Sequence, residues 1–138
     1  TCPDSIESEY SFNSLINVRD NLVAFKRLFS GSDGQGFDDF IRSEGFPEVS
    51  ERMLTNVDNA ISIANSLTGT LVEESARITS SAEETACSNA FASPDSANSD
   101  YGACRLNGAV KRVTDDLKID FVTITGTNIP EGAQSDND

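Results

Sequence analysis

The sequence contains no histidine and no tryptophan. The absence of histidine excludes a histidine general base, Ser-His and Cys-His nucleophile pairs, imidazole metal ligands and the HExxH zinc site. Positive charge is also scarce, because 10 Lys and Arg stand against 23 Asp and Glu, for a formal net charge of −13 at pH 7. Phosphate backbones and anionic membrane surfaces bind cationic proteins, so we expect the chain to bind no nucleic acid.

Long hydrophobic runs are missing as well. No run approaches the roughly 20 apolar residues of a membrane-spanning helix, so we expect a chain that does not span a membrane. With 138 residues, the chain has the length of one domain that can bury a sizeable core. We expect a helical domain over residues 1–126, followed by a polar, acidic tail over residues 127–138.

Apolar residues recur every three or four positions in four stretches, as they do on one face of a helix. The first stretch starts at a cap, Ser11 or Ser14, and stops at Gly31; the second runs from Pro47 to Gly69. The third covers residues 70–92 and is broken near residues 79–81. The last covers residues 106–124 and ends at Gly126. Four helices joined by short loops predict an all-α fold, an antiparallel four-helix up-down bundle.

Smaller features refine this prediction. A short helix is expected at residues 37–42, and the apolar run at residues 121–124 is expected to be helical rather than a strand. Ser81 and Glu84 have the form of a capping box that restarts the third helix. On the last helix, Lys111 with Asp115 and Arg112 with Asp116 have the i, i+4 spacing of ion pairs. We expect both pairs on the outer, exposed face of this helix.

Three cysteines stand at positions 2, 87 and 104, with no CxxC pair among them. Cys87 and Cys104 flank a segment rich in turn-forming residues, so a disulfide between them would close a connection between two helices. Closing a loop of this size would contribute about 3 kcal/mol in the chain-entropy model. The alternative is a pair of free thiols in a reducing cytosol. Cys2 then either bonds to another polypeptide or is a free thiol near the N-terminus.

No motif for catalysis or metal binding emerges from these residues. The glycine-rich loop at residues 31–36 does not match the dinucleotide or P-loop patterns, and the acids around it do not match an EF-hand. Adjacent acid pairs, such as Glu73 with Glu74, point about 100° apart on a helix and so do not share one site. We therefore expect no catalytic residue and no metal ligand within this chain.

Several short stretches nevertheless resemble the second half of imelysin-like proteins. They are residues 7–15 (ESEYSFNSL), 20–22 (DNL), 28–31 (LFSG), 34–41 (GQGFDDFI), 115–126 (DDLKIDFVTITG) and 129–130 (IP). Thr125 departs from the Leu-Gly pair of the family's ending, and the interrupted third helix with its cysteines has no counterpart in the pattern. The resemblance implies a fold of two helical bundles, of which this chain would be the second, C-terminal one.

The same resemblance implies a function. Imelysin-like proteins are bacterial envelope proteins, often periplasmic lipoproteins, linked to iron or haem acquisition, and some were first classed as metallopeptidases. Their G-x-H-x-x-E motif lies in the first half, so this chain, without histidine, cannot contain it. Iron or haem would then be bound together with a companion N-terminal bundle from the same precursor. A disulfide of Cys2 could link this companion to the chain. No cofactor is expected in this chain alone.

The candidate site that the resemblance implies is a cleft between the two bundles. Its matching polar residues here are Glu7, Ser8, Tyr10, Ser11, Ser14 and Asn21. Ser11 and Ser14 could instead be helix caps, and Asn21 could bridge helices. The main hypothesis is a binding module, and the alternatives are a metallopeptidase fragment and a purely structural or interaction bundle. A missing half would leave the face of Phe12, Ile16 or Val23 exposed or covered by another chain.

Overall fold

The computed structural model describes residues 13–96 and 100–127, and the regular secondary structure of these residues is all helical, with no strand among them. In chain order the helices are α1 (Ser14–Phe29), α2 (Phe37–Ser43), α3 (Pro47–Ser66), α4 (Leu71–Ala76), α5 (Ser81–Ala92) and α6 (Gly102–Asp116). A π-helical turn, η2 (Leu117–Phe121), and a last turn, α7 (Val122–Thr125), continue α6. The expected helical class is confirmed, including residues 121–124. No helix in the described part is long and apolar enough to cross a membrane.

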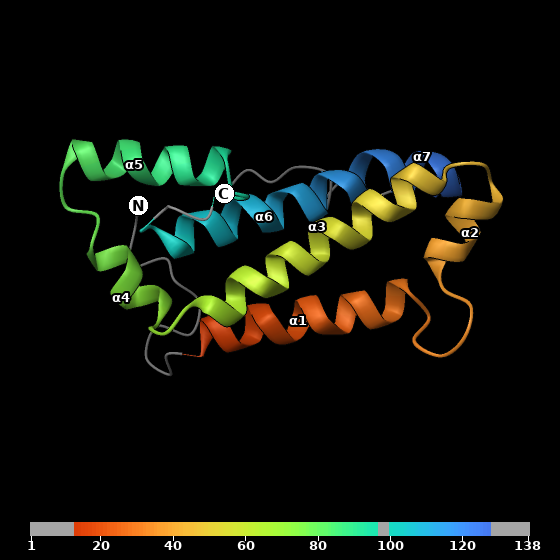
Figure 1. The fold of residues 1–138 in the computed structure, drawn as a ribbon, viewed down its shortest axis with the longest axis horizontal. Helices are drawn as coiled ribbons and strands as arrows, with labels where there is room; N and C mark the ends of the chain where they lie inside the picture. The colour runs from red at the N-terminus through yellow and green to blue at the C-terminus, as the bar shows by residue number, and fades with distance from the viewer. Residues whose placement is uncertain (1–12, 97–99, 128–138) are drawn as a thin grey trace.

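Three long helices form the body of the molecule. In Figure 1, α1, α3 and α6 lie lengthwise along the long axis, and α3 packs against both α1 and α6. At one end α2 folds back onto α3, and at the other end α4 turns the chain towards α5, which packs on α6. The molecule is therefore a three-helix body with a smaller helical arm, made of α4 and α5, at one end.

The helix ends follow the local signals in the sequence. Gly31 and Gly126 adopt the left-handed region, with φ of 66° and 63°, directly after α1 and α7. Pro47 occupies the first turn of α3, where a missing N–H costs nothing. The capping box of α5 lies one residue earlier than expected, because Ser80 and Glu83 form it rather than Ser81 and Glu84. The expected cap at Ser14 is also wrong, since Ser14 is the first residue inside α1 and Asn13 precedes it.

The buried apolar residues form two clusters along the body. The larger joins α1, α3 and α6 and contains Leu22, Val57, Ala60, Ile63, Ala64, Leu106, Ala109 and Val113. The smaller lies towards α2 and contains Phe29, Ile41, Val49 and Met53. Phe25 and Leu117 pack against both clusters, so the two form one continuous core. This core holds both α2 and α6 against α1 and α3.

The antiparallel up-down order expected from the sequence is not confirmed. Cys87 of α5 is disulfide-bonded to Cys104 of α6, with their Cα atoms 5.4 Å apart. One turn further along each helix, the Phe91 carbonyl lies against Gly108. Since both contacts advance in the same direction, α5 runs parallel to α6, as Figure 1 also shows. The end of α5 and the start of α6 therefore lie at opposite ends of this helix pair.

Polar side chains fasten α6 to its neighbours. The expected pair Lys111–Asp115 is present, with Nζ 2.7 Å from Oδ1. The expected pair Arg112–Asp116 is wrong, because Arg112 bonds to Asp95 in the connection that follows α5. Asp116 is buried and points towards α3, where its two carboxylate oxygens are occupied by donors from that helix. These donors are Arg52 Nε at 3.0 Å and Asn56 Nδ2 at 2.7 Å.

Candidate functional site

Of the six polar residues implied by the family resemblance, two lie within the described residues. Glu7, Ser8, Tyr10 and Ser11 lie outside those residues, as does Cys2. The other two are both on α1, where Ser14 is half-buried and Asn21 is exposed. Neither of these two residues lines the apolar pocket between α1, α4, α5 and α6. The candidate inter-bundle cleft is therefore a prediction that these residues leave untested.

The exposure of the α1 face is mixed. Ile16 is 45% exposed, Val23 is half-buried, and Phe12 lies outside the described residues. A complete domain would bury both Ile16 and Val23 in its own core. Because neither side chain is fully buried, the exposure of this face is compatible with a missing half. It also does not identify what would cover it.

An apolar pocket of about 510 Å³ lies between the arm and the body. Its walls come from four helices and from Ile78, which follows α4. Nine lining residues are apolar: Val18, Leu71, Ile78, Cys87, Phe91, Ala103, Cys104, Leu106 and Val110. Four are polar: Glu74, Ser75, Ser88 and Asn107. This size and lining are those of a small-molecule site.

Helical spacing explains how the sequence builds these walls. On α6, Ala103, Leu106 and Val110 follow one another at three and four residues, and so lie on one face. Cys87 and Phe91 have the same relation on α5. The larger core cluster contains Leu106 as well as Ala109 and Val113, and Val110 packs against it. Leu106 and Val110 therefore belong both to the core and to the pocket wall, so the pocket lies directly beside the core.

The disulfide Cys87–Cys104 forms part of the pocket wall. It confirms the pairing expected from the sequence. Next to it, Gly108 allows the backbones of α5 and α6 to approach closely, since a Cβ at this position would lie 2.1 Å from the Phe91 carbonyl oxygen. The bond and the glycine together hold α5 against α6, and this contact encloses one side of the pocket.

Three of the four polar side chains in the pocket already use their hydrogen-bonding groups. Glu74 accepts from Arg77 Nη1 at 3.0 Å and from the backbone N–H of Ala103 at 3.3 Å. The hydroxyls of Ser75 and Ser88 each donate to a carbonyl of their own helix at 2.9 Å. Within the described part of the chain, only the side-chain amide of Asn107 is left without a hydrogen-bond partner in this pocket.

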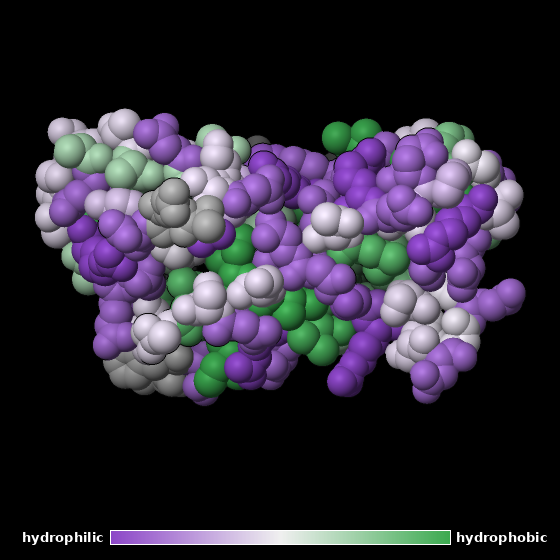
Figure 2. Space-filling view, viewed as in Figure 1, coloured by the Kyte–Doolittle hydropathy of each residue, from purple (hydrophilic) through white to green (hydrophobic). Residues whose placement is uncertain are grey.

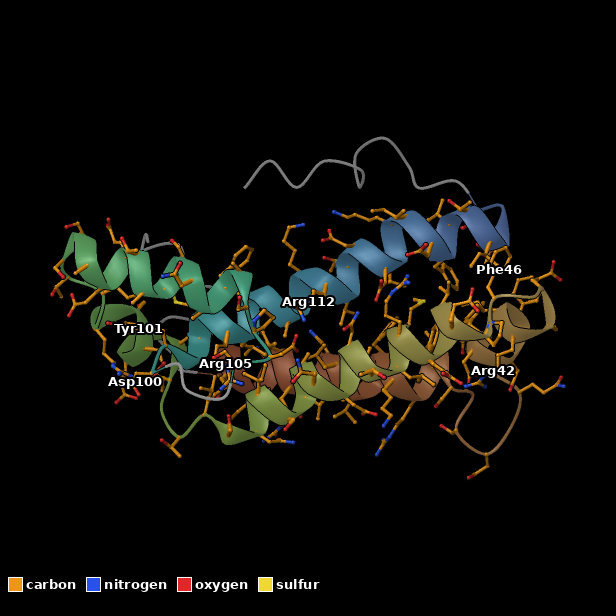
Figure 3. The ribbon with its side chains drawn as sticks, turned by 45° about the horizontal axis from the view of Figure 1, so that its top comes forward. Arg42, Phe46, Asp100, Tyr101, Arg105 and Arg112 are labelled. Carbon is orange, nitrogen blue, oxygen red and sulfur yellow. A yellow bond between two sulfur atoms is a disulfide. The ribbon has the colours of Figure 1, made fainter. Side chains whose placement is uncertain are left out.

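Charged and aromatic residues line the end of the arm beside the pocket. The Arg77 guanidinium lies 5.7 Å from the centre of the Tyr101 ring, a cation–π contact. Figure 3 shows Tyr101 and Arg105 near the start of α6 and Arg112 further along it. Arg105 Nε donates to the Pro94 carbonyl oxygen at 3.1 Å. These contacts hold Pro94 and Tyr101, which lie on either side of residues 97–99.

Figure 2 shows where hydrophobic surface is visible on one face of the molecule. Hydrophobic side chains appear in the middle of this face, over α1, α3 and α6, surrounded by hydrophilic residues. An apolar patch with a polar rim is the usual appearance of a binding surface. No group of three metal-ligating side chains (His, Cys, Asp or Glu) exists within residues 13–96 and 100–127.

No family model, curated protein or solved structure matches this chain.

The sequence contained only part of the signal for the pocket. The sequence shows the apolar stripe after Gly69 and the cysteine pair, and both contribute to the pocket wall. Asn107 carried no signal, because a single asparagine on a helix is most often a solvated side chain. Nothing in the periodicity of α6 distinguishes a residue that faces only the core from one that also lines a pocket.

Proposed function

We propose that this chain is a ligand-binding helical module rather than an enzyme, and that it binds its ligand in the apolar pocket between the arm and the body. The observation that carries the proposal is the pocket itself: about 510 Å³, lined by nine apolar residues and braced by a disulfide. Ion pairs and backbone bonds occupy most of the polar groups around it. Such a surface offers burial to an apolar ligand and no arranged nucleophile or base.

The family resemblance extends this proposal. If the chain is the second bundle of an imelysin-like envelope protein, the pocket would serve a larger molecule whose companion bundle contributes to binding. Iron and haem, the ligands that the resemblance implies, do not fit this pocket alone. Its one carboxylate, Glu74, is already bonded to Arg77 and to the Ala103 N–H, and the chain has no imidazole. Any iron or haem site would need residues of the companion.

The pocket can be tested with a neutral fluorescent probe, N-phenyl-1-naphthylamine, whose emission rises in apolar surroundings. We expect saturable binding to the full chain with one site. Ser88→Trp places a large side chain in the pocket from the exposed face of α5, and we expect it to weaken probe binding at least tenfold. Thr85→Trp is the matched control, because Thr85 is also exposed on α5, makes the same kind of bond to its own helix and does not line the pocket.

Equal binding by both tryptophan variants, or no saturable binding by the unmodified chain, would contradict the proposal. The companion bundle has its own test: mass spectrometry of the protein from its native source, with and without reductant. A heavier species that disappears on reduction is expected if Cys2 joins this chain to another polypeptide. The same mass under both conditions, with no G-x-H-x-x-E segment upstream in the gene, would oppose the imelysin-like part of the proposal.

A further inference from the structure

The pocket's polar groups also indicate which ligands it can accept. The only ionisable side chain in its lining is Glu74, whose side chain is 17% exposed. Arg77 balances this charge, and both carboxylate oxygens already accept a hydrogen bond. A charged ligand group would therefore enter an apolar hollow that has no free opposite charge, and it would lose its hydration without replacement.

Among the described residues, Asn107 is the lining side chain whose donors and acceptor are both unused, whereas the Ser75 and Ser88 hydroxyls already donate their protons and can only accept. Its amide offers two N–H donors and one carbonyl acceptor. It lies one position after Leu106 on α6 and is exposed, whereas Leu106 is buried. Asn107 therefore stands at the solvent side of the pocket, and the apolar residues lie deeper. A ligand would place its polar end at Asn107 and its apolar body against α5 and α6.

We propose that the pocket selects a neutral amphiphile: an uncharged apolar body with a single hydroxyl or carbonyl group that hydrogen-bonds to Asn107. This inference rests on the proposed function, because it assumes that the pocket binds ligands. Long-range electrostatics also disfavour anionic amphiphiles. The net charge of −13 repels anionic amphiphiles before they reach the pocket.

Three probes with the same alkyl chain separate the possible head groups. Dodecanol is neutral, dodecanoate is anionic, and dodecyltrimethylammonium is cationic. Each is titrated against N-phenyl-1-naphthylamine bound to the full chain, with dodecanol kept below its aqueous solubility and the two ionic probes below their critical micelle concentrations. The titrations would be made in 0.5 M NaCl, where the long-range attraction of the acidic protein for cations is screened. The measured quantity is the concentration of each probe that displaces half of the bound fluorophore.

We expect dodecanol to displace the fluorophore at a concentration at least tenfold lower than either charged probe. Asn107→Leu keeps a side chain of similar size but removes its hydrogen-bonding groups, and we expect it to weaken dodecanol about fivefold. The matched control is Asn65→Leu, because Asn65 is an exposed asparagine of α3 that does not line the pocket. We expect this control to leave dodecanol binding unchanged.

Two results would overturn the inference while leaving the proposed function intact. One is displacement by dodecanoate or dodecyltrimethylammonium at the same concentration as dodecanol or lower. The other is unchanged dodecanol binding in Asn107→Leu. If N-phenyl-1-naphthylamine itself does not bind, the proposed function fails instead, so the two failures are distinguishable.

Discussion

Gly108 determines how closely α5 can approach α6. A Cβ at this position would lie 2.1 Å from the carbonyl oxygen of Phe91, which belongs to the backbone and cannot rotate away. We expect Gly108→Ala to destabilise the protein by about 1–3 kcal/mol, because the two helices must separate. Urea unfolding followed by circular dichroism measures the change.

The control for this substitution is Gly34→Ala. A Cβ on Gly34 would meet only the Gly31 carbonyl oxygen, at 3.5 Å, which is an ordinary contact. We expect a change within about 0.5 kcal/mol for this exposed loop position. Equal stability of Gly108→Ala and the unmodified protein would show that α5 does not pack as closely as the structure indicates.

Glu83 makes the stability of the first turn of α5 dependent on pH. Its carboxylate accepts hydrogen bonds from the backbone N–H and the hydroxyl of Thr79, and also from Ser80. These bonds to the charged form lower the pKa of Glu83 below its ordinary value. A carboxyl whose folded pKa is depressed stabilises the folded state above its unfolded pKa, and this contribution is lost as the pH falls through the folded pKa.

We therefore expect α5 to lose stability below about pH 4.5, the ordinary pKa of glutamate. Hydrogen exchange of the first α5 amides, measured between pH 6 and pH 3, should show less protection at the acid end after correction for the intrinsic exchange rate. In Glu83→Gln this acid-dependent loss should be smaller. Glu84→Gln is the control, since its carboxylate has no hydrogen-bond partner within the described residues. A similar acid response in all three proteins would contradict the assignment to Glu83.

At the scale of elements, the arm depends on its covalent link to the body. Ala90 is the only fully buried residue of α5, so few buried contacts hold this helix in place. The Cys87–Cys104 bond closes a loop with a sequence separation of 17 residues, for which the chain-entropy model gives about 3 kcal/mol. We expect Cys87→Ala with Cys104→Ala to lower the free energy of unfolding by about this amount.

The same double variant should also bind N-phenyl-1-naphthylamine more weakly, because both cysteines line the pocket. Unfolding in urea and probe titration measure the two effects on one sample. Treatment of the unmodified protein with reductant should reproduce both results. If stability and probe binding are unchanged, the arm is held by its noncovalent contacts alone.

Local signals predicted most helix ends, and long-range contacts decided the rest. Gly31, Pro47 and Gly126 act through their own backbone preferences, which depend little on the rest of the molecule. The capping box of α5 was placed one residue too late, because Ser80 and Ser81 are chemically identical and only the folded backbone distinguishes them. The direction of α5 relative to α6 had no local signal at all.

The candidate site was predictable to a smaller extent. The cysteine pairing could be inferred because the two residues flank a turn-rich segment. The partner of Asp116 could not, since Arg52 lies 64 residues away in the sequence and helical spacing suggested Arg112 instead. A pocket between four helices depends on how their faces meet, which no single stretch of sequence encodes.

At the scale of the whole molecule, the excess of acidic residues opposes folding. With a net charge of −13, the compact state brings like charges together, although several ion pairs such as Lys111–Asp115 offset part of this repulsion. Salt screens the repulsion over a Debye length of about 10 Å at 0.1 M. We expect the melting temperature to rise between 0.02 M and 0.5 M NaCl. A fall in melting temperature over this range would show that favourable ion pairs outweigh the excess of negative charge.

The parallel pairing of α5 with α6 has a consequence for proteolytic cleavage. The Cys87–Cys104 bond bridges the whole connection between these helices. A protease that cuts one peptide bond between the two cysteines would therefore leave a single covalent molecule, and the two fragments would separate only after reduction. In an oxidising compartment the protein can be nicked in this connection and still keep both sides of its pocket together.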